Sequence, residues 1–127
     1  MKTLGIGVDI CENSRIKKLI NNKLFLRRIF TNDEIVKSNI KNKTLYYAKR
    51  FAAKEAFAKA LGIGFRQGLN FKDISIINDK LGKPSFIITS KIKSIIKKKY
   101  NLKNFNLFLS ISDEKKYSIA FVLFEKK

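Results

Sequence analysis

Apolar and bare positions alternate with a period of two near the start of the chain. The apolar positions are Leu4, Ile6, Val8 and Ile10, and the positions between them are Gly5, Gly7 and Asp9. This alternation predicts a β-strand over residues 4–10 with one apolar face and one nearly bare face. Asp9 belongs to the bare face, where the two glycines leave room for a helix or a ligand to approach closely.

Helical spacing begins after this strand. A polar pair suited to an N-cap is followed by apolar residues at helical spacing, with basic residues between them: Asn13 and Ser14, then Ile16, Leu19 and Ile20. This pattern predicts a short basic helix. Thr31 and Glu34 have the spacing of a capping box, so a second helix is expected to begin there.

A long helix is predicted over residues 45–61, because this stretch is rich in alanine and free of glycine and proline. Gly62 and Gly64 are expected to end it. The remaining pattern predicts strands at 71–77 and 85–89 joined by a turn, a basic helix at about 90–100, and a hairpin with strands at 105–112 and 117–124. Helices mixed with hairpins predict an α+β fold, in which helices pack on an antiparallel sheet.

Length and hydropathy favour one globular domain over residues 1–127. The chain has 127 residues, of which 45% are hydrophobic, enough for one packed core. No apolar run approaches the roughly 20 residues that span a bilayer, and the acid at position 9 interrupts any signal-like core. We therefore expect a cytoplasmic protein with no membrane partner.

The residue types restrict the chemistry. Cys11 is the single cysteine and histidine is absent, which excludes an intrachain disulfide, a Cys/His zinc site and a nucleophile paired with histidine. Acid–base or metal chemistry must then rely on carboxylates, lysines, tyrosines or water. With 10 acidic residues in the chain, a site built from a few carboxylates would suit a hard cation such as Mg2+.

The net charge is the strongest compositional signal. Lys and Arg number 28, and the formal net charge is +18 at pH 7. Such a charge permits nucleic acid, an anionic membrane surface or an acidic protein as partner, and it does not choose between them. A general excess of Ile, Asn and Lys along the chain reduces its weight as a sign of binding.

Glu55 is the first candidate for chemistry. On a helical wheel with about 100° per residue, its neighbours are small or apolar: Ala48, Phe51, Ala52 and Ala58. A carboxylate on such a sector loses hydration unless it has a partner, and Lys59 is the basic residue one turn away. Two interpretations are open: a surface helix pair contributing about 0.3–0.5 kcal/mol, or a functional acid.

Asp9 leaves the same choice open, since an acid at the end of an apolar strand is often a turn residue or a helix cap. If the alanine-rich helix packs on the bare face of the first strand, Asp9 and Glu55 converge. Two carboxylates at close range repel each other unless a cation lies between them. The spacing alone does not decide between these possibilities.

Two long segments carry specific motifs: GIGVDI at residues 5–10 and RFAAKEAFAKALG at residues 50–62. Three more follow in order: GLNFKDI at 68–74, NDKLGKP at 78–84 and LSIS at 109–112. Together they resemble the holo-[acyl-carrier-protein] synthase family over nearly the whole chain. The resemblance implies the 4'-phosphopantetheinyl transferase fold, assembled as a homotrimer with active sites at subunit interfaces.

The resemblance also implies a reaction. The 4'-phosphopantetheine group of coenzyme A moves to a serine of an acidic apo-acyl carrier protein, for fatty acid biosynthesis, and 3',5'-bisphosphoadenosine leaves. Asp9 and Glu55 are implied to bind Mg2+, which holds the coenzyme pyrophosphate. Glu55 is then the candidate base, directly or through a metal-bound water, and Lys59 offsets charge on the phosphates.

Further positions follow from the resemblance alone. The implied coenzyme contacts are Arg50, Lys59, Gly62, Lys83, Pro84 and Ser112, and the implied carrier-docking residues are Arg15, Arg27 and Arg28. Docking charges mainly raise the encounter rate and orient the complex. Each position also has a plainer interpretation, such as a helix stop for Gly62, a turn for Lys83 and Pro84, or a solvated helix face for the arginines.

One position departs from the family pattern. Asp113 stands where the family usually has a histidine near the coenzyme. A carboxylate there replaces a donor with an acceptor and would repel a phosphate. Either Lys115 or Lys116 compensates, or the affinity for the coenzyme is lowered.

Two other interpretations compete with the transferase. A small basic nucleic-acid-binding protein would explain the charge and the aromatic residues among lysines, but not the motifs, and the sequence has no RNP-type or zinc-finger signature. An inactive structural relative is the third possibility, and it rests on Asp113 alone.

Overall fold

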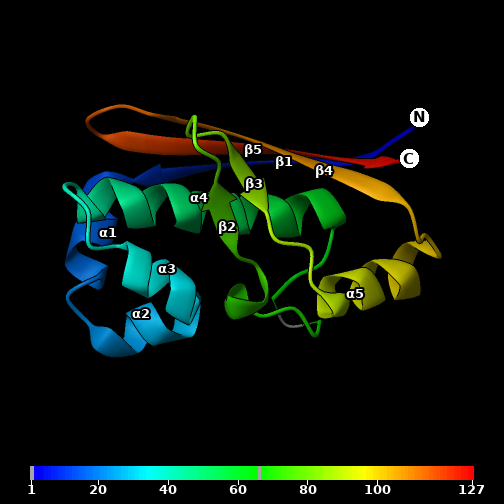
Figure 1. The fold of residues 1–127 in the computed structure, drawn as a ribbon, viewed down its shortest axis with the longest axis horizontal. Coiled ribbons are helices and arrows are strands. Elements are labelled where there is room, and N and C mark those ends of the chain that lie inside the picture. Colours follow the sequence, from blue (N-terminus) through cyan, green and yellow to red (C-terminus); the bar gives the residue numbers. More distant parts are fainter. Residues whose placement is uncertain (1, 66) are drawn as a thin grey trace.

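The computed structural model describes residues 2–65 and 67–127. Its elements in chain order are β1 (Lys2–Glu12), α1 (Asn13–Leu19), α2 (Lys23–Ile29), α3 (Asn32–Lys37), α4 (Lys43–Leu61), the 3-10 turn η1 (Phe71–Asp73), β2 (Ile76–Asn78), β3 (Pro84–Phe86), α5 (Ser90–Tyr100), β4 (Phe105–Asp113) and β5 (Tyr117–Lys126). Figure 1 shows a sheet lying as one layer above the helices. The α+β class predicted from the sequence is confirmed.

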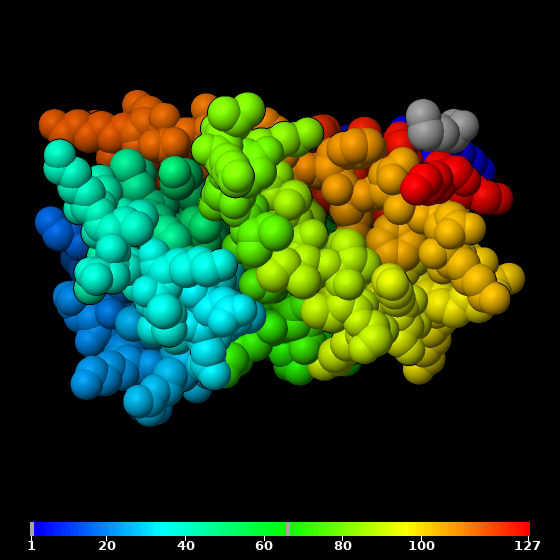
Figure 2. Space-filling model, viewed as in Figure 1, coloured from blue at the N-terminus to red at the C-terminus, as the bar shows by residue number. Residues whose placement is uncertain are grey.

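The main sheet has three antiparallel strands in the order β1-β5-β4. The predicted C-terminal hairpin supplies its central and one edge strand, and β1 pairs along almost its whole length with β5. Asp9 lies opposite Ala120 in this register. The strands β2 and β3 form a separate two-stranded antiparallel sheet, and Figure 2 shows their turn standing out as a ridge beside the main sheet.

Helix α4 runs beneath the main sheet (Figure 1). The bare face of β1 is turned toward it: a Cβ atom built at Gly5 would overlap the carbonyl oxygen of Ala60, and one at Gly7 would overlap that of Ala56. The alanines of this helix face are fully or almost fully buried. Glycine on the strand and alanine on the helix therefore let two backbones pack closer than larger side chains would permit.

The apolar face of β1 is turned away from the core. Ile6, Val8 and Ile10 have exposed fractions of 61%, 55% and 59%. Phe108 of β4 and Phe121 of β5 are also exposed on this three-stranded surface. The face built from these strands is therefore a broad apolar surface that nothing in the described part of the chain covers, and we call it the outer sheet face.

The other predicted elements agree with the structure in part. The capping box at Thr31 and Glu34 is confirmed at the start of α3, and α5 occupies the predicted residues. The strand predicted over 71–77 was wrong over residues 71–75, because residues Phe71–Asp73 form a 3-10 turn and β2 begins at Ile76. The partner strand β3 is correspondingly short and ends at Phe86.

Two features near the first helix also differ from the prediction. Asn13 is not an N-cap but the first residue of α1, and its buried side chain donates to the carbonyl oxygens of Glu114 and Lys115 at 3.0 and 3.2 Å. The short helix α2 was not predicted. Asn22 caps it by accepting a hydrogen bond from the Leu24 amide at 2.9 Å.

Across residues 2–65 and 67–127, none of the helices combines the length and the apolar character needed to cross a membrane.

Candidate functional site

The two motif acids occupy facing elements. Asp9 projects from the bare face of β1 and Glu55 from α4, and both are partly buried. The Asp9 charge contributes to the electrostatic environment of Glu55, and Arg15 and Lys59 contribute positive charge. The structure therefore brings together the two acids that the sequence placed 46 positions apart.

Lys59 bridges the same two elements. Its ammonium lies 3.2 Å from the Asp9 carboxylate and donates to the Val8 carbonyl oxygen at 3.0 Å. The helix pair Glu55–Lys59, one of the two interpretations of the sequence, is not among the ion pairs of the described residues, whereas Lys59–Asp9 is. Lys59 remains 54% exposed, so its charge is also accessible to a ligand.

The environment of Glu55 disfavours its charged form. Burial is the main cause of its raised pKa, the Asp9 charge adds to it, and the cations Lys59 and Arg15 oppose both. Burial also raises the pKa of the nearby Cys11 thiol to about 11, so at neutral pH this thiol is protonated and is not a nucleophile.

The pair Asp9–Glu55 fits a magnesium ion. Two carboxylates close enough for the Asp9 charge to raise the pKa of Glu55 are the donors that a hard cation favours. The described residues contain no cluster of three or more His, Cys, Asp or Glu side chains that could hold a metal. An ion here would take its other ligands from water and substrate oxygens, as Mg2+ commonly does.

Arg50 forms a second cluster one and a half turns earlier on α4. Its guanidinium donates to the Asn78 side chain at 2.7 Å and stacks 3.7 Å from the centre of the Tyr46 ring. It is 7% exposed, and its Nε has no hydrogen-bond partner in the described structure. It shares a pocket with Pro84 and Asp113. Two implied coenzyme contacts, Arg50 and Pro84, therefore share one pocket with Asp113, the residue that differs from the family pattern.

The remaining implied coenzyme contacts lie at three different places in the fold. Gly62 has φ of 62°, ends α4 in the left-handed conformation, and accepts a hydrogen bond from Lys99 at its carbonyl oxygen. Lys83 is exposed in the β2–β3 turn. Ser112 is exposed and belongs to the outer sheet face, on the opposite side of the main sheet from Asp9.

The implied docking arginines are all exposed. Arg15 lies on α1, 5.9 Å from the centre of the Phe51 ring, and its charge acts on Glu55. Arg27 and Arg28 are in the last turn of α2. Arg15 therefore stands beside the acid pair, and the other two arginines extend the positive surface along the next helix.

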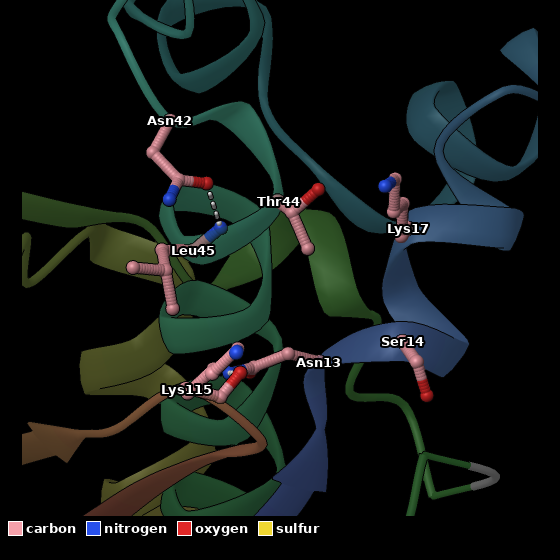
Figure 3. A pocket seen from close by; sticks show the side chains of 7 residues that line it. All are labelled: Asn13, Ser14, Lys17, Asn42, Thr44, Leu45 and Lys115. Carbon is pink, nitrogen blue, oxygen red and sulfur yellow. Dashed lines mark hydrogen bonds between the residues drawn. The ribbon is translucent and has the colours of Figure 1, made fainter.

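A further polar pocket opens between α1, α4 and the β4–β5 turn. Figure 3 shows Asn42 capping the first turn of α4, with Lys17 and Lys115 entering from α1 and from the turn. Its lining residues are Asn13, Ser14, Lys17, Asn42, Thr44, Leu45 and Lys115. Lys115 therefore lines a different pocket from Asp113, which does not support the prediction that Lys115 offsets the Asp113 charge.

Two residues that contact or adjoin the site residues, Asn78 and Lys54, were not predicted from the sequence. Asn78 was read only as part of a turn, and its bond to Arg50 joins residues 28 positions apart. Lys54 precedes Glu55 in the motif and is completely buried. The sequence signal that could have indicated Lys54 is a lysine among the alanines of the predicted helix.

The family follows from comparison with known proteins. A family model described as the 4'-phosphopantetheinyl transferase superfamily matches residues 5–122. The chain belongs to this superfamily, as its motifs predicted, and the transferase class of enzyme is confirmed with it.

The individual proteins to which the chain is similar are holo-[acyl-carrier-protein] synthases. The chain is 62% identical over 128 aligned residues to the holo-[acyl-carrier-protein] synthase of Pelagibacter ubique, with 100% of both chains covered. It is 41% identical to that of Zymomonas mobilis, with 96% of both covered. The solved synthase of Neisseria meningitidis has a TM-score of 0.85 and 39% identity over 96% of this chain and 98% of that one. The Bacillus anthracis synthase, solved in complex with CoA (3',5'-ADP), has a TM-score of 0.81 and 35% identity over 100% of both chains.

Proposed function

We propose that this protein is a holo-[acyl-carrier-protein] synthase, which transfers 4'-phosphopantetheine from coenzyme A to a serine of an acidic apo-acyl carrier protein in fatty acid biosynthesis. The observation that carries the proposal is the convergence of Asp9, Glu55 and Lys59 at motif positions on β1 and α4. The full-length similarity to the Pelagibacter ubique synthase supports the same activity.

The reaction needs a base for the serine proton, positive charge to offset the phosphates, and a serine hydroxyl that accepts the phosphopantetheine group. The carrier serine oxygen forms a bond to the β-phosphorus of coenzyme A, while the bond to the leaving 3',5'-bisphosphoadenosine breaks and its electron pair leaves with that product. Glu55 is the candidate base for the serine proton, because it lies beside Asp9 and the chain has no histidine. Lys59 is placed to offset charge on the phosphates.

Asp9 and Glu55 are the residues that would hold Mg2+. When bound, the ion supplies charge neutralisation at the pyrophosphate and makes the phosphorus more electrophilic. Glu55 serves both as a ligand and as the candidate base in this proposal. Arg50, Gly62, Lys83, Pro84 and Ser112 are proposed to contact other parts of the coenzyme.

We infer further that the active enzyme is a homotrimer with its sites between subunits. The uncovered outer sheet face supports assembly, because an apolar surface of this kind is usually covered by another protein surface. The separation of Ser112 from Asp9 within one chain supports sites completed by a neighbouring copy. Light scattering coupled to gel filtration would test the mass of the assembly, with Ile10→Lys expected to give monomers.

Docking of the carrier follows from charge. Arg15 lies on α1 near Glu55, and Arg27 and Arg28 in the last turn of α2 extend the exposed basic surface. An acidic carrier that binds there would bring its serine toward the acid pair. This arrangement mainly accelerates encounter and should weaken as the salt concentration rises.

The proposal is tested by the intact mass of a purified apo-acyl carrier protein incubated with this protein, coenzyme A and Mg2+. We expect a gain of one phosphopantetheine that disappears when the metal is chelated. Asp9→Asn and Glu55→Gln should abolish the gain and leave the circular dichroism spectrum unchanged. Full activity in both variants would refute the site, and no gain with a competent carrier would refute the function.

A further inference from the structure

The reaction proposed above does not use the most deeply buried ion pair of the described structure. Lys54 is 0% exposed and Glu34 is 2% exposed, and the ammonium and carboxylate lie 2.6 Å apart. The Lys54 ammonium also donates to the carbonyl oxygens of Ile29 at 2.8 Å and Phe71 at 3.3 Å. Burial lowers the pKa of Lys54, and the Glu34 charge opposes this shift.

This pair connects α4 to the start of β2. The second carboxylate oxygen of Glu34 accepts a hydrogen bond from the Ile76 amide at 3.2 Å. The first oxygen accepts from the Thr31 amide at 3.0 Å as part of the capping box. Glu34 therefore joins Lys54 of α4 to the first residue of β2 through buried contacts.

Arg50 connects the same helix to the other end of β2. It stands four residues before Lys54, and residues four apart lie on the same side of a helix. Its guanidinium donates to the side chain of Asn78, the last residue of β2. Two buried cations on one side of α4 thus hold both ends of a strand that has only three residues and lies outside the main sheet.

The strand that they hold leads into the coenzyme contacts. Lys83 and Pro84 lie in the turn after β2 and at the start of β3. Glu55 directly follows Lys54 on α4. The distance between the proposed coenzyme contacts and the proposed base therefore depends on how the β2–β3 hairpin sits on this helix.

We propose that Lys54 and Glu34 are positioning residues, which hold the β2–β3 hairpin on α4 so that bound coenzyme A is aligned with Glu55. The proposal rests on the proposed function. A buried ion pair is not by itself a strong source of stability, because hydrophobic replacement of both partners is often neutral or stabilising. Replacing both partners at once therefore allows an effect on coenzyme alignment to be measured separately from an effect on stability.

The decisive variant is the double substitution Glu34→Leu/Lys54→Met. Lys54→Met alone should lower the melting temperature, because it leaves the Glu34 carboxylate buried without its cation. The double variant should recover part of that loss, because it leaves no buried charge without its partner. Its KM for coenzyme A should nevertheless stay raised by about tenfold, because the Ile76 amide still lacks its acceptor, while its KM for the carrier changes much less.

Glu34→Gln provides a second arm, because the side chain keeps its shape but no longer balances the charge of the buried Lys54 ammonium. We expect a several-fold higher KM for coenzyme A there as well. Lys91→Met is the matched control: Lys91 pairs with Asp73 at 2.7 Å, but it is 48% exposed, and its removal should change neither constant.

Wild-type coenzyme KM values in both the double variant and Glu34→Gln would overturn the proposal and leave the ion pair as a purely structural feature. If the double variant does not fold, the Glu34→Gln result decides alone. Failure of the wild-type protein to modify a competent carrier would instead refute the proposed function, so the two failures are distinguishable.

Discussion

Substitution of Gly7 by alanine tests whether the close contact between β1 and α4 sets the site. A Cβ atom at position 7 would lie 2.7 Å from the amide nitrogen of Ala60 and even closer to the carbonyl oxygen of Ala56. Both neighbours are backbone atoms, so no side chain can rotate away. The helix must retreat from the strand or the strand must bend.

The size of the effect follows from the overlap. Nonbonded carbon and nitrogen atoms need roughly 3.4 Å, so α4 must move by on the order of 1 Å to clear both neighbours. Overpacking of this kind costs about 1–3 kcal/mol of unfolding free energy. Because Asp9 and Glu55 lie on the two separating elements, a displacement of about 1 Å is expected to lower kcat/KM by roughly a hundredfold.

The assay combines thermal unfolding with the rate of carrier modification. Gly64→Ala is the matched control, because a Cβ atom there meets nothing within 4 Å. We expect the Gly7→Ala variant to melt several degrees lower than this control and to be much slower. A Gly7→Ala protein with the melting temperature and kcat/KM of the control would refute the argument that backbone contact sets the distance between the acids.

Three other predictions concern single side chains. The pKa of Glu55 is raised above its ordinary value of 4.5 in the metal-free folded protein, so above that pH the folded state binds more protons than the unfolded state. The free energy of unfolding is therefore not reduced by Glu55 below that pH, and it falls as the pH rises through the folded pKa. Melting temperatures in EDTA from about pH 4 to 8 should show a decline that Glu55→Gln lacks, and equal slopes for the two proteins would contradict this prediction. Asp113→Asn should lower the KM for coenzyme A about two- to fivefold, because it removes a negative charge from the Arg50 pocket, and an unchanged KM would show that Asp113 does not face the coenzyme. Thr31→Ala should cost about 1 kcal/mol in urea unfolding through loss of the capping box, whereas an unchanged unfolding midpoint would show that the cap contributes nothing.

Local patterns were sufficient for most elements. The alternation around Gly5 and Gly7, the alanine-rich stretch ended by Gly62, and the capping box at Thr31 each depend on residues close in sequence, and all three correspond to observed elements. The short helix α2 and the 3-10 turn at Phe71 were missed. Both are short and lack strong periodicity, so tertiary packing decides their conformation.

The two motif acids also show the difference between what the local sequence indicates and what tertiary packing decides. Sequence alone identified Asp9 and Glu55 as candidates, and it left open whether they were surface residues. Their convergence depends on α4 packing against the glycines of β1, which is a contact between residues about 50 positions apart. Spacing cannot reveal such a contact, because loop closure and packing decide which helix reaches the strand.

Sequence by itself determined the family, the α+β class and the acids at the centre of the proposed chemistry, because these depend on residue identity and local periodicity. Only the tertiary structure decided which side of β1 is buried, since an alternating strand has two faces and Ile6, Val8 and Ile10 are the exposed ones. It also decided that Lys54 is buried against Glu34, 20 residues away. A charge is stable inside a protein only when its partners are in place, and those partners come from segments that only the complete fold brings together.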